Sequence, residues 1–130
     1  MATVVWGDEP EERAVVSAED VREVLVEVDR LAAEHPLIVD VTVDSGDTLG
    51  VALGGDVSVL LFGVASKKPP YFVSRGRAPR RGDGVVGFGY FGSRTEFLES
   101  QVIPLRDALD AACLFVADGE RPGNVGWTEV

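Results

Sequence analysis

The sequence predicts an α+β fold: a mostly antiparallel, twisted sheet of about six to seven strands, with two amphipathic helices packed on it. Two stretches, one near each end of the chain, carry apolar residues at the helical period, and the region between them has the alternating or continuous apolar runs of strands. Several consecutive strands without intervening helices exclude a doubly wound parallel sheet. With 130 residues, 45% of them hydrophobic and 26% charged, residues 1–130 are expected to form a single domain.

The first helix has the clearest start signal in the chain. A short strand is expected at residues 3–6 and an acidic loop at residues 8–13. Ser17 then supplies a hydroxyl that can cap free N–H groups, and Asp20 completes an approximate capping box. The helix is expected to stop near His35, because the proline that follows disfavours helical backbone. One apolar stripe at helical spacing runs along it: Val21, Val24, Leu25, Val28, Leu31 and Ala32.

Five strand or turn signals follow in the middle of the chain. Residues 38–44 alternate valine with polar residues, and residues 49–53 alternate larger apolar residues with glycine and alanine, so each predicts a strand. The G-G-D sequence at 54–56 predicts a hairpin turn. Residues 57–62 are apolar on both faces and predict a central strand covered on both sides or paired deeply. A further strand is expected at residues 71–74.

The C-terminal half ends in a second helix and a last strand. A basic loop is expected at residues 75–84, followed by a strand at 85–91 whose glycines allow close approach of another backbone. Pro104 is well placed as the first helical residue, and Gly119 as the residue that terminates the helix. Residues 125–129 then alternate as a final strand.

The charge of the chain is strongly acidic and unevenly distributed. The formal net charge is −10. Residues 67–81 hold six of the 12 Lys and Arg residues and no acid, so the rest of the chain carries the other six against all 22 acids. Phosphate repulsion argues against nucleic acid as the direct partner. The acidic body suits a basic protein partner, although solubility alone would also explain it.

The N-terminal residues and the cysteine content favour the cytoplasm. The N-terminus lacks the basic start and apolar core of a signal peptide, and the longest apolar run, 57–65, is far shorter than the roughly 20 residues that span a bilayer. No membrane association is therefore expected. The lone Cys113 cannot form an internal disulfide, and its place in a helical pattern predicts a small buried residue.

No group of residues predicts catalysis, a metal site or a cofactor. The glycines at 82, 84 and 87 spell G-x-G-x-x-G, but they lead into a strand rather than a helix, which favours a hairpin loop over a dinucleotide site. The D-S-G-D sequence at 44–47 lacks the rest of a calcium loop and predicts a turn. No Cys/His cluster suits zinc. His35 is expected to meet the helix dipole, and Glu96 and Glu99 to be solvated loop acids past a strand end.

Three segments make the chain resemble the immunity proteins of bacterial polymorphic toxin systems, in particular the small family often paired with nucleic-acid deaminase toxins. The first is P-P-Y-F at residues 69–72. The second is Y-F-G at 90–92, followed by E-F at 96–97 and I-P at 103–104. The third is the alanine-rich helix that closes in G-E-R-P at 119–122, with V-x-W-x-E at 125–129. The residues of this signature expected to hold the fold are Tyr71, Phe91, Gly92, Phe97, Pro104, Arg121, Pro122, Trp127 and Glu129.

The resemblance implies a cytoplasmic antitoxin that performs no chemistry. It would bind a cognate toxin domain, of deaminase or nuclease type, and occlude its active site. Because such toxins bind nucleic acid, an acidic inhibitor can imitate the polyanionic substrate. The residues expected to contact the toxin are Asp44, Asp47, Asp56, Glu96, Glu99 and Tyr90.

Two other classes of function stay open on the sequence. One is an acidic protein-interaction module whose partner is not a toxin. The other, which the lone histidine and the misplaced glycine motif disfavour, is a small hydrolase or nucleotide-binding protein.

Overall fold

The computed structural model describes residues 2–7, 9–76 and 84–130. Two helices, α1 (Ala18–Leu31) and α2 (Leu105–Asp118), and a 3-10 turn, η1 (Glu99–Gln101), accompany the strands. The strands are β1 Ala2–Trp6, β2 Glu11–Val15, β3 Leu37–Val43, β4 Thr48–Leu53, β5 Val57–Ser58, β6 Leu60–Gly63, β7 Phe72–Arg75, β8 Val85–Tyr90, β9 Ser93–Leu98, β10 Ile103–Pro104 and β11 Gly126–Glu129.

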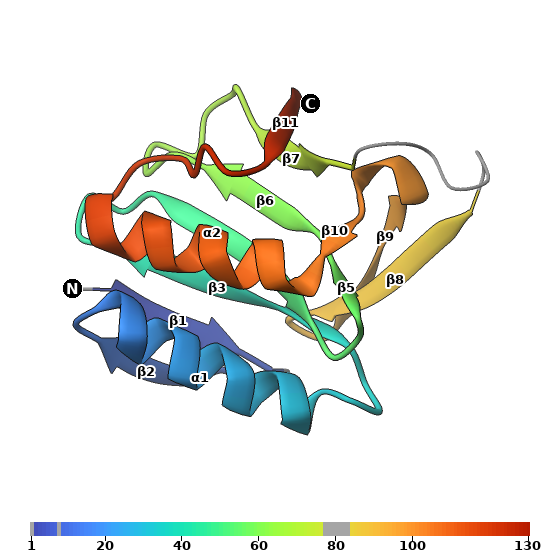
Figure 1. Cartoon of the computed structure of the whole chain (residues 1–130), viewed down its shortest axis with the longest axis horizontal. Helices are drawn as coiled ribbons and strands as arrows, with labels where there is room; N and C mark the ends of the chain where they lie inside the picture. The colour runs from blue at the N-terminus through green and yellow to red at the C-terminus, as the bar shows by residue number, and fades with distance from the viewer. Residues whose placement is uncertain (1, 8, 77–83) are drawn as a thin grey trace.

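Nine strands form one sheet, in which the main path runs β11-β7-β6-β4-β3-β1-β2 (Figure 1). All neighbours along this path are antiparallel. The β8–β9 hairpin branches from β3 through one parallel pair, Leu37 with Gly89. The short strands β5 and β10 pair separately. The predicted α+β class with a mostly antiparallel sheet is confirmed.

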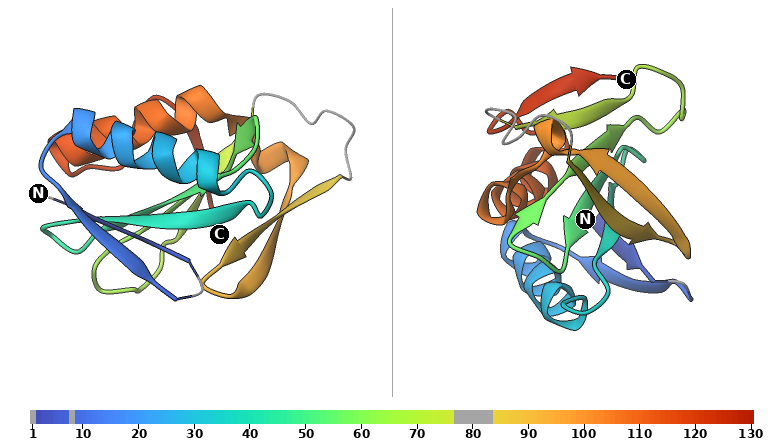
Figure 2. Two further views of the ribbon diagram at one scale, coloured as in Figure 1. Left: turned by 90° about the horizontal axis from the view of Figure 1, so that it is seen from below. Right: turned by 90° about the vertical axis from the view of Figure 1, so that its right-hand side faces the viewer.

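Both helices lie side by side on one face of the sheet (Figure 2). The alternate residues of the strands that point to this face, such as Val41 in β3 and Val51 in β4, are completely buried against the helices. The helices contribute Leu25 and Phe115, whose side chains are both fully buried in this layer. This layer is the main hydrophobic core.

The opposite face of the sheet is covered only in part. The β8–β9 hairpin folds over it and places Phe88 and Phe97 against Ile38, Ala52 and Val73, which form a second, smaller buried cluster. The remainder of this face has no secondary-structure element above it in the described part of the chain, and the candidate site lies there.

Two of the four predicted helix ends, the start of α1 and the end of α2, are confirmed. The Ser17 hydroxyl accepts a hydrogen bond from the Asp20 N–H at 3.2 Å, as a cap should. The Asp20 carboxylate accepts from the Val16 N–H rather than from Ser17, so the capping box is shifted by one residue. Gly119 ends α2 with φ of 74°, the left-handed conformation expected of a C-terminal glycine.

Other predicted boundaries are wrong. Pro104 is not the first helical residue, because it lies in β10 and precedes the helix, which begins at Leu105. Helix α1 stops at Leu31, four residues before His35. The continuous strand predicted at 57–62 is broken at Val59, because β5 turns away to pair with β10 while β6 stays in the sheet between β4 and β7.

Besides the two-residue β10, two strands were not predicted. Residues 11–13, expected in an acidic loop, belong to β2, an edge strand that pairs with β1. Residues 93–98, which include Glu96, form β9 rather than a loop past a strand end. Both strands are held by antiparallel pairing to a neighbour and bury few side chains, so they carry little hydrophobic signal.

Parts of two predictions, the basic loop at 75–84 and the G-x-G-x-x-G pattern that begins at Gly82, lie outside the described residues. Among those described, Gly87 lies inside β8 and is covered by the Arg94 side chain. No helix in the described ranges is long and apolar enough to cross a membrane.

Candidate functional site

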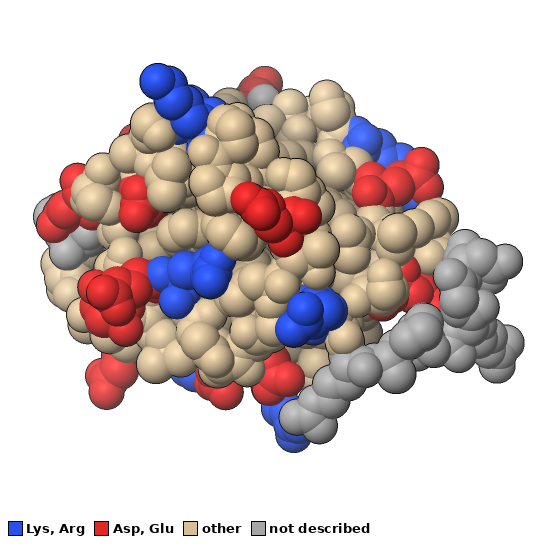
Figure 3. Space-filling model, turned by 90° about the horizontal axis from the view of Figure 1, so that it is seen from above, with Lys and Arg blue, Asp and Glu red and all other residues tan. Residues whose placement is uncertain are grey.

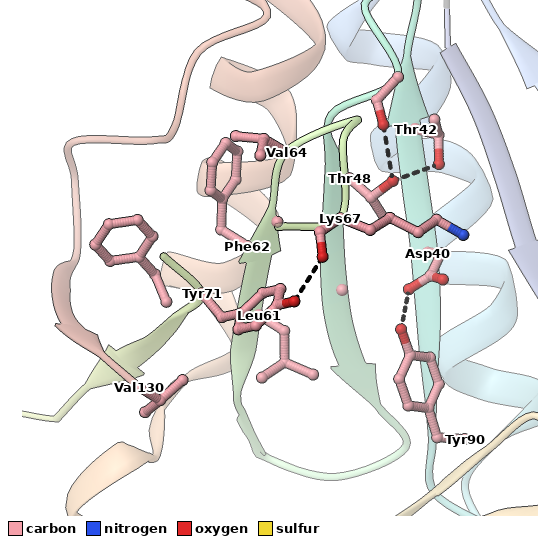
Figure 4. A pocket seen from close by; sticks show the side chains of 14 residues that line it. Asp40, Thr42, Thr48, Leu61, Phe62, Val64, Lys67, Tyr71, Tyr90 and Val130 are labelled. Carbon is pink, nitrogen blue, oxygen red and sulfur yellow. Dashed lines mark hydrogen bonds between the residues drawn. The ribbon is translucent and has the colours of Figure 1, made fainter. Parts of the chain in front are cut away.

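The uncovered half of the sheet is hollowed into a groove of about 660 Å³, which we call the sheet groove (Figure 4). It lies on the opposite side of the sheet from the two helices. Its lining comes from the central strands, the segment between β6 and β7, the start of β7 and the ends of β8 and of the chain after β11: Asp40, Thr42, Gly46, Thr48, Gly50, Leu61, Phe62, Gly63, Val64, Lys67, Tyr71, Phe72, Tyr90 and Val130.

A carboxylate in the central strand β3 is the main charged group in the floor. The Tyr90 hydroxyl, which comes from the end of β8, donates a hydrogen bond to Asp40 Oδ1 at 2.7 Å. The Lys67 side chain reaches across the groove toward the same carboxylate (Figure 4). Burial raises the pKa of the Asp40 carboxyl, and the Tyr90 hydrogen bond and the Lys67 charge oppose that rise. Burial and the bond to Asp40 likewise raise the pKa of Tyr90.

Hydrogen bonds fix the segment between β6 and β7 that forms one wall. The Asp47 carboxylate accepts from the Ala65 N–H at 2.9 Å, which ties this segment to the turn between β3 and β4. The Tyr71 hydroxyl donates to the Lys67 carbonyl oxygen. Asp47, predicted to contact a partner, therefore has a structural bond that holds the wall in place.

A second hollow of about 340 Å³ adjoins the groove across Thr42. It lies over β1, β2 and β3, and Glu12 and Asp44 line it. The same face of the sheet thus carries the carboxylates of Asp40, Asp44 and Glu12, and the ammonium group of Lys67.

The six residues predicted to contact a partner do not form one cluster. Tyr90 lines the groove, and Asp44 lines the adjoining hollow. Asp56 lies in the turn between β4 and β5, at the opposite end of the six-residue strand β4 from Asp44. Strands rise about 3.3 Å per residue, so the two turns are roughly 20 Å apart.

The remaining two predicted acids lie on or next to the β8–β9 hairpin. Glu96 is exposed on β9. Glu99 opens η1 and is half-buried, and its Oε2 is buried with no hydrogen-bond partner among the described residues. The description of Glu99 as a solvated loop acid is therefore wrong.

The C-terminal signature residues pack on the outer strands. The Arg121 guanidinium lies 4.1 Å from the centre of the Phe72 ring and 5.9 Å from that of Trp127, which are cation–π distances. The Trp127 indole N–H donates to the Pro122 carbonyl oxygen at 2.7 Å. These contacts tie the segment after α2 to β7 and β11.

The other signature residues hold the hairpin and two strand ends. Phe91 and Gly92, with φ of 48° and 88°, are the two residues of the tight turn between β8 and β9. Phe97 is buried in the second cluster. Pro104 pairs with Val57, and Glu129 is exposed on β11.

Cys113 and His35, the residues considered for catalysis, lie outside the sheet groove. The Cys113 thiol lies between the helices and donates to the Ala18 carbonyl oxygen at 3.4 Å, and burial raises its pKa. His35 follows α1, and its backbone N–H donates to the Ala32 carbonyl oxygen. In the described ranges, no group of three or more His, Cys, Asp or Glu side chains is placed to hold a metal ion.

Sequence reasoning missed Asp40, Thr42 and Thr48 as site residues. Asp40 and Thr42 fall on the polar face of the alternating strand predicted at 38–44, where solvent exposure is the ordinary expectation, and Thr48 lies just before the strand predicted at 49–53. One signal was available: aspartate is uncommon in strands, and Asp40 lies in the middle of a valine-rich predicted strand.

Residues 9–129 match the family model described as Immunity protein Imm1. The chain belongs to this family. The resemblance drawn from the three aromatic and C-terminal segments is thereby confirmed, and it extends over nearly the whole chain. No curated protein matches the sequence.

Membership of Imm1 makes the chain an immunity protein, whose partner is a cognate toxin. It indicates a role in binding rather than in chemistry. In the view from above (Figure 3), acidic and basic groups are interspersed on the Imm1 protein among uncharged surface, so charge of one sign does not mark a binding patch there.

Proposed function

We propose that this Imm1 protein binds a toxin domain that acts on nucleic acid, a deaminase in the first instance, and neutralises it in the cytoplasm by occluding its active site. The observation that carries the proposal is the Imm1 match over residues 9–129. In this function the protein acts by binding and catalyses nothing.

The charge of the chain supports a toxin of this kind. A protein that acts on nucleic acid needs Lys and Arg residues to neutralise phosphates. The immunity protein has a net charge of −10, which favours association with such a basic surface through electrostatic steering. An acidic surface placed over the toxin active site would also repel the nucleic acid substrate.

Co-expression with the toxin encoded beside this gene tests the proposal. We expect cells that produce both proteins to survive, and the two proteins to purify as a stable one-to-one complex. Purified immunity protein should abolish deamination of nucleic acid by the toxin when equimolar amounts are mixed. Death of the cells, or survival without a complex, would contradict the proposal. A complex whose toxin cuts nucleic acid instead of deaminating it would contradict only the toxin type.

A further inference from the structure

The sheet groove has the composition of the centre of a protein interface. Of the nine exposed large hydrophobic side chains in the described part, Val64, Tyr71 and Val130 line it, with exposures of 36%, 42% and 64%. A fourth, Phe91, stacks on Tyr90 with ring centres 5.1 Å apart. Aromatic and apolar residues gathered around a few polar groups are typical of the residues that dominate binding energy.

The groove is held in shape before any partner arrives. Tyr90 is fixed by its bond to Asp40, and Tyr71 by its bond to the Lys67 carbonyl oxygen. The floor is a central part of a nine-stranded sheet, and the main core supports it from below. A rigid surface loses little conformational entropy on binding, which favours affinity.

The charges on this face favour a cationic occupant. The described charged residues that line the groove and the adjoining hollow are three acids, Asp40, Asp44 and Glu12, and one base, Lys67. Asp40 is also half-buried, and a carboxylate withdrawn from water is stabilised by a cation close to it. Lys67, on an exposed segment, supplies only part of that stabilisation.

We propose that the sheet groove receives a protruding basic segment of the toxin, with a Lys or Arg side chain beside the Asp40 carboxylate and apolar groups packed against Val64, Tyr71 and Val130. This inference rests on the proposed function, because it names the surface through which the toxin is bound. It places the toxin on the sheet face opposite α1 and α2.

One glycine allows the groove to be filled without disturbing the fold. A Cβ added to Gly63, on β6, would meet no atom within 4 Å. The Gly63→Leu variant therefore projects an uncharged side chain into the groove. Gly123→Leu is the matched control, because an added Cβ there also meets nothing and the adjacent Asn124 amide bonds to α2, on the helical layer.

A second pair of variants tests the charge. Asp40→Asn keeps the shape of the side chain and an oxygen that can accept from Tyr90, but removes the negative charge. Glu19→Gln makes the same charge change on α1, in the helical layer on the far side of the sheet. Circular dichroism and thermal melting establish that each variant is folded.

The measurement is the Kd of each folded variant for the toxin domain encoded beside this gene. We expect Gly63→Leu and Asp40→Asn to weaken binding by about tenfold or more, and the two controls to stay within about twofold of the parent.

If both groove variants bind like the parent, the groove assignment is overturned while the proposed function stands. If only Gly63→Leu weakens binding, the cationic occupant is overturned. If Gly63→Leu changes self-association of the chain and leaves toxin binding intact, the occupant is a second copy and the inference fails. If the parent itself does not bind the toxin, the proposed function fails first.

Discussion

Asp40 has an unusual environment for a charged residue. It is a half-buried carboxylate in the middle of a valine-rich central strand, bonded to a tyrosine hydroxyl from a separate hairpin. Burial disfavours its charged form, and neither Tyr90 nor Lys67 fully compensates, because the net shift of its pKa is upward. A residue that costs stability in its ionised form at this position is a reasonable candidate for a binding role.

The raised pKa of Asp40 predicts how stability depends on pH. The native carboxyl keeps its proton to a higher pH than the unfolded one, whose pKa is about 3.9. Between these two values the native state binds more protons, so the parent loses stability as pH rises through that window. The amide of Asp40→Asn cannot ionise. We therefore expect this variant to gain stability relative to the parent between about pH 3 and about pH 7 in urea unfolding. A relative loss over the same range would contradict the shift.

At the scale of the element, the β8–β9 hairpin shows where sequence reasoning reaches its limit. Its turn residues are Phe91 and Gly92, both with positive φ, whereas the usual sequence signal for such a turn is Asn-Gly or Asp-Gly. Without that signal, the strand before the turn was recognised and the strand after it was not. In β9 only Phe97 is buried, so hydrophobic alternation is weak.

The elements that were predicted correctly are those whose signals come from residues close together in the sequence. The capped helix α1, the alternating strands β3 and β4 and the glycine at the end of α2 each follow from local periodicity and backbone chemistry. The edge strand β2 and the sheet groove depend on which distant segments become neighbours. Asp40 and Tyr90 are 50 residues apart in the chain, and no local pattern joins them.

The turn between β4 and β5 depends on one glycine. Gly54 has φ of 108°, and a Cβ at this position would collide with the Ala32 carbonyl oxygen at the end of α1. We expect Gly54→Ala to lower the free energy of unfolding by more than about 1 kcal/mol, as left-handed strain and the collision add. Gly123→Ala, where the added Cβ meets open space, should change it by less than about 1 kcal/mol in either direction. Urea unfolding of both variants checks this, and equal effects would contradict it.

At the scale of the whole molecule, the two faces of the sheet differ in how much of each is covered by other elements. One face is covered by α1 and α2 over its central strands and contains the main core. The other is covered by a hairpin over part of its area and left open over the rest (Figure 2). This division allows the open face to change for a particular toxin without disturbing the core.

The net charge of the whole molecule predicts how binding responds to salt. With a charge of −10 and a basic toxin, long-range attraction should accelerate encounter at low ionic strength. We expect the association rate constant to fall by about tenfold or more between about 0.05 M and about 0.5 M NaCl, and the dissociation rate constant to change less. Stopped-flow or surface plasmon resonance measurements would show this. An association rate independent of salt would contradict electrostatic steering.

Cys113 offers a chemical probe of the contact between the two helices. It is the one thiol in the sequence, and it lies between α1 and α2 with its Sγ against the Ala18 carbonyl oxygen. Cys113 is half-buried rather than fully buried as predicted, and its raised pKa should make modification by a thiol reagent slower than that of an ordinary exposed thiol. The labelling rate of the unaltered protein therefore reports on the contact between the two helices. Slower labelling with toxin seated on the opposite face would show that binding there reduces the motion of the helical layer.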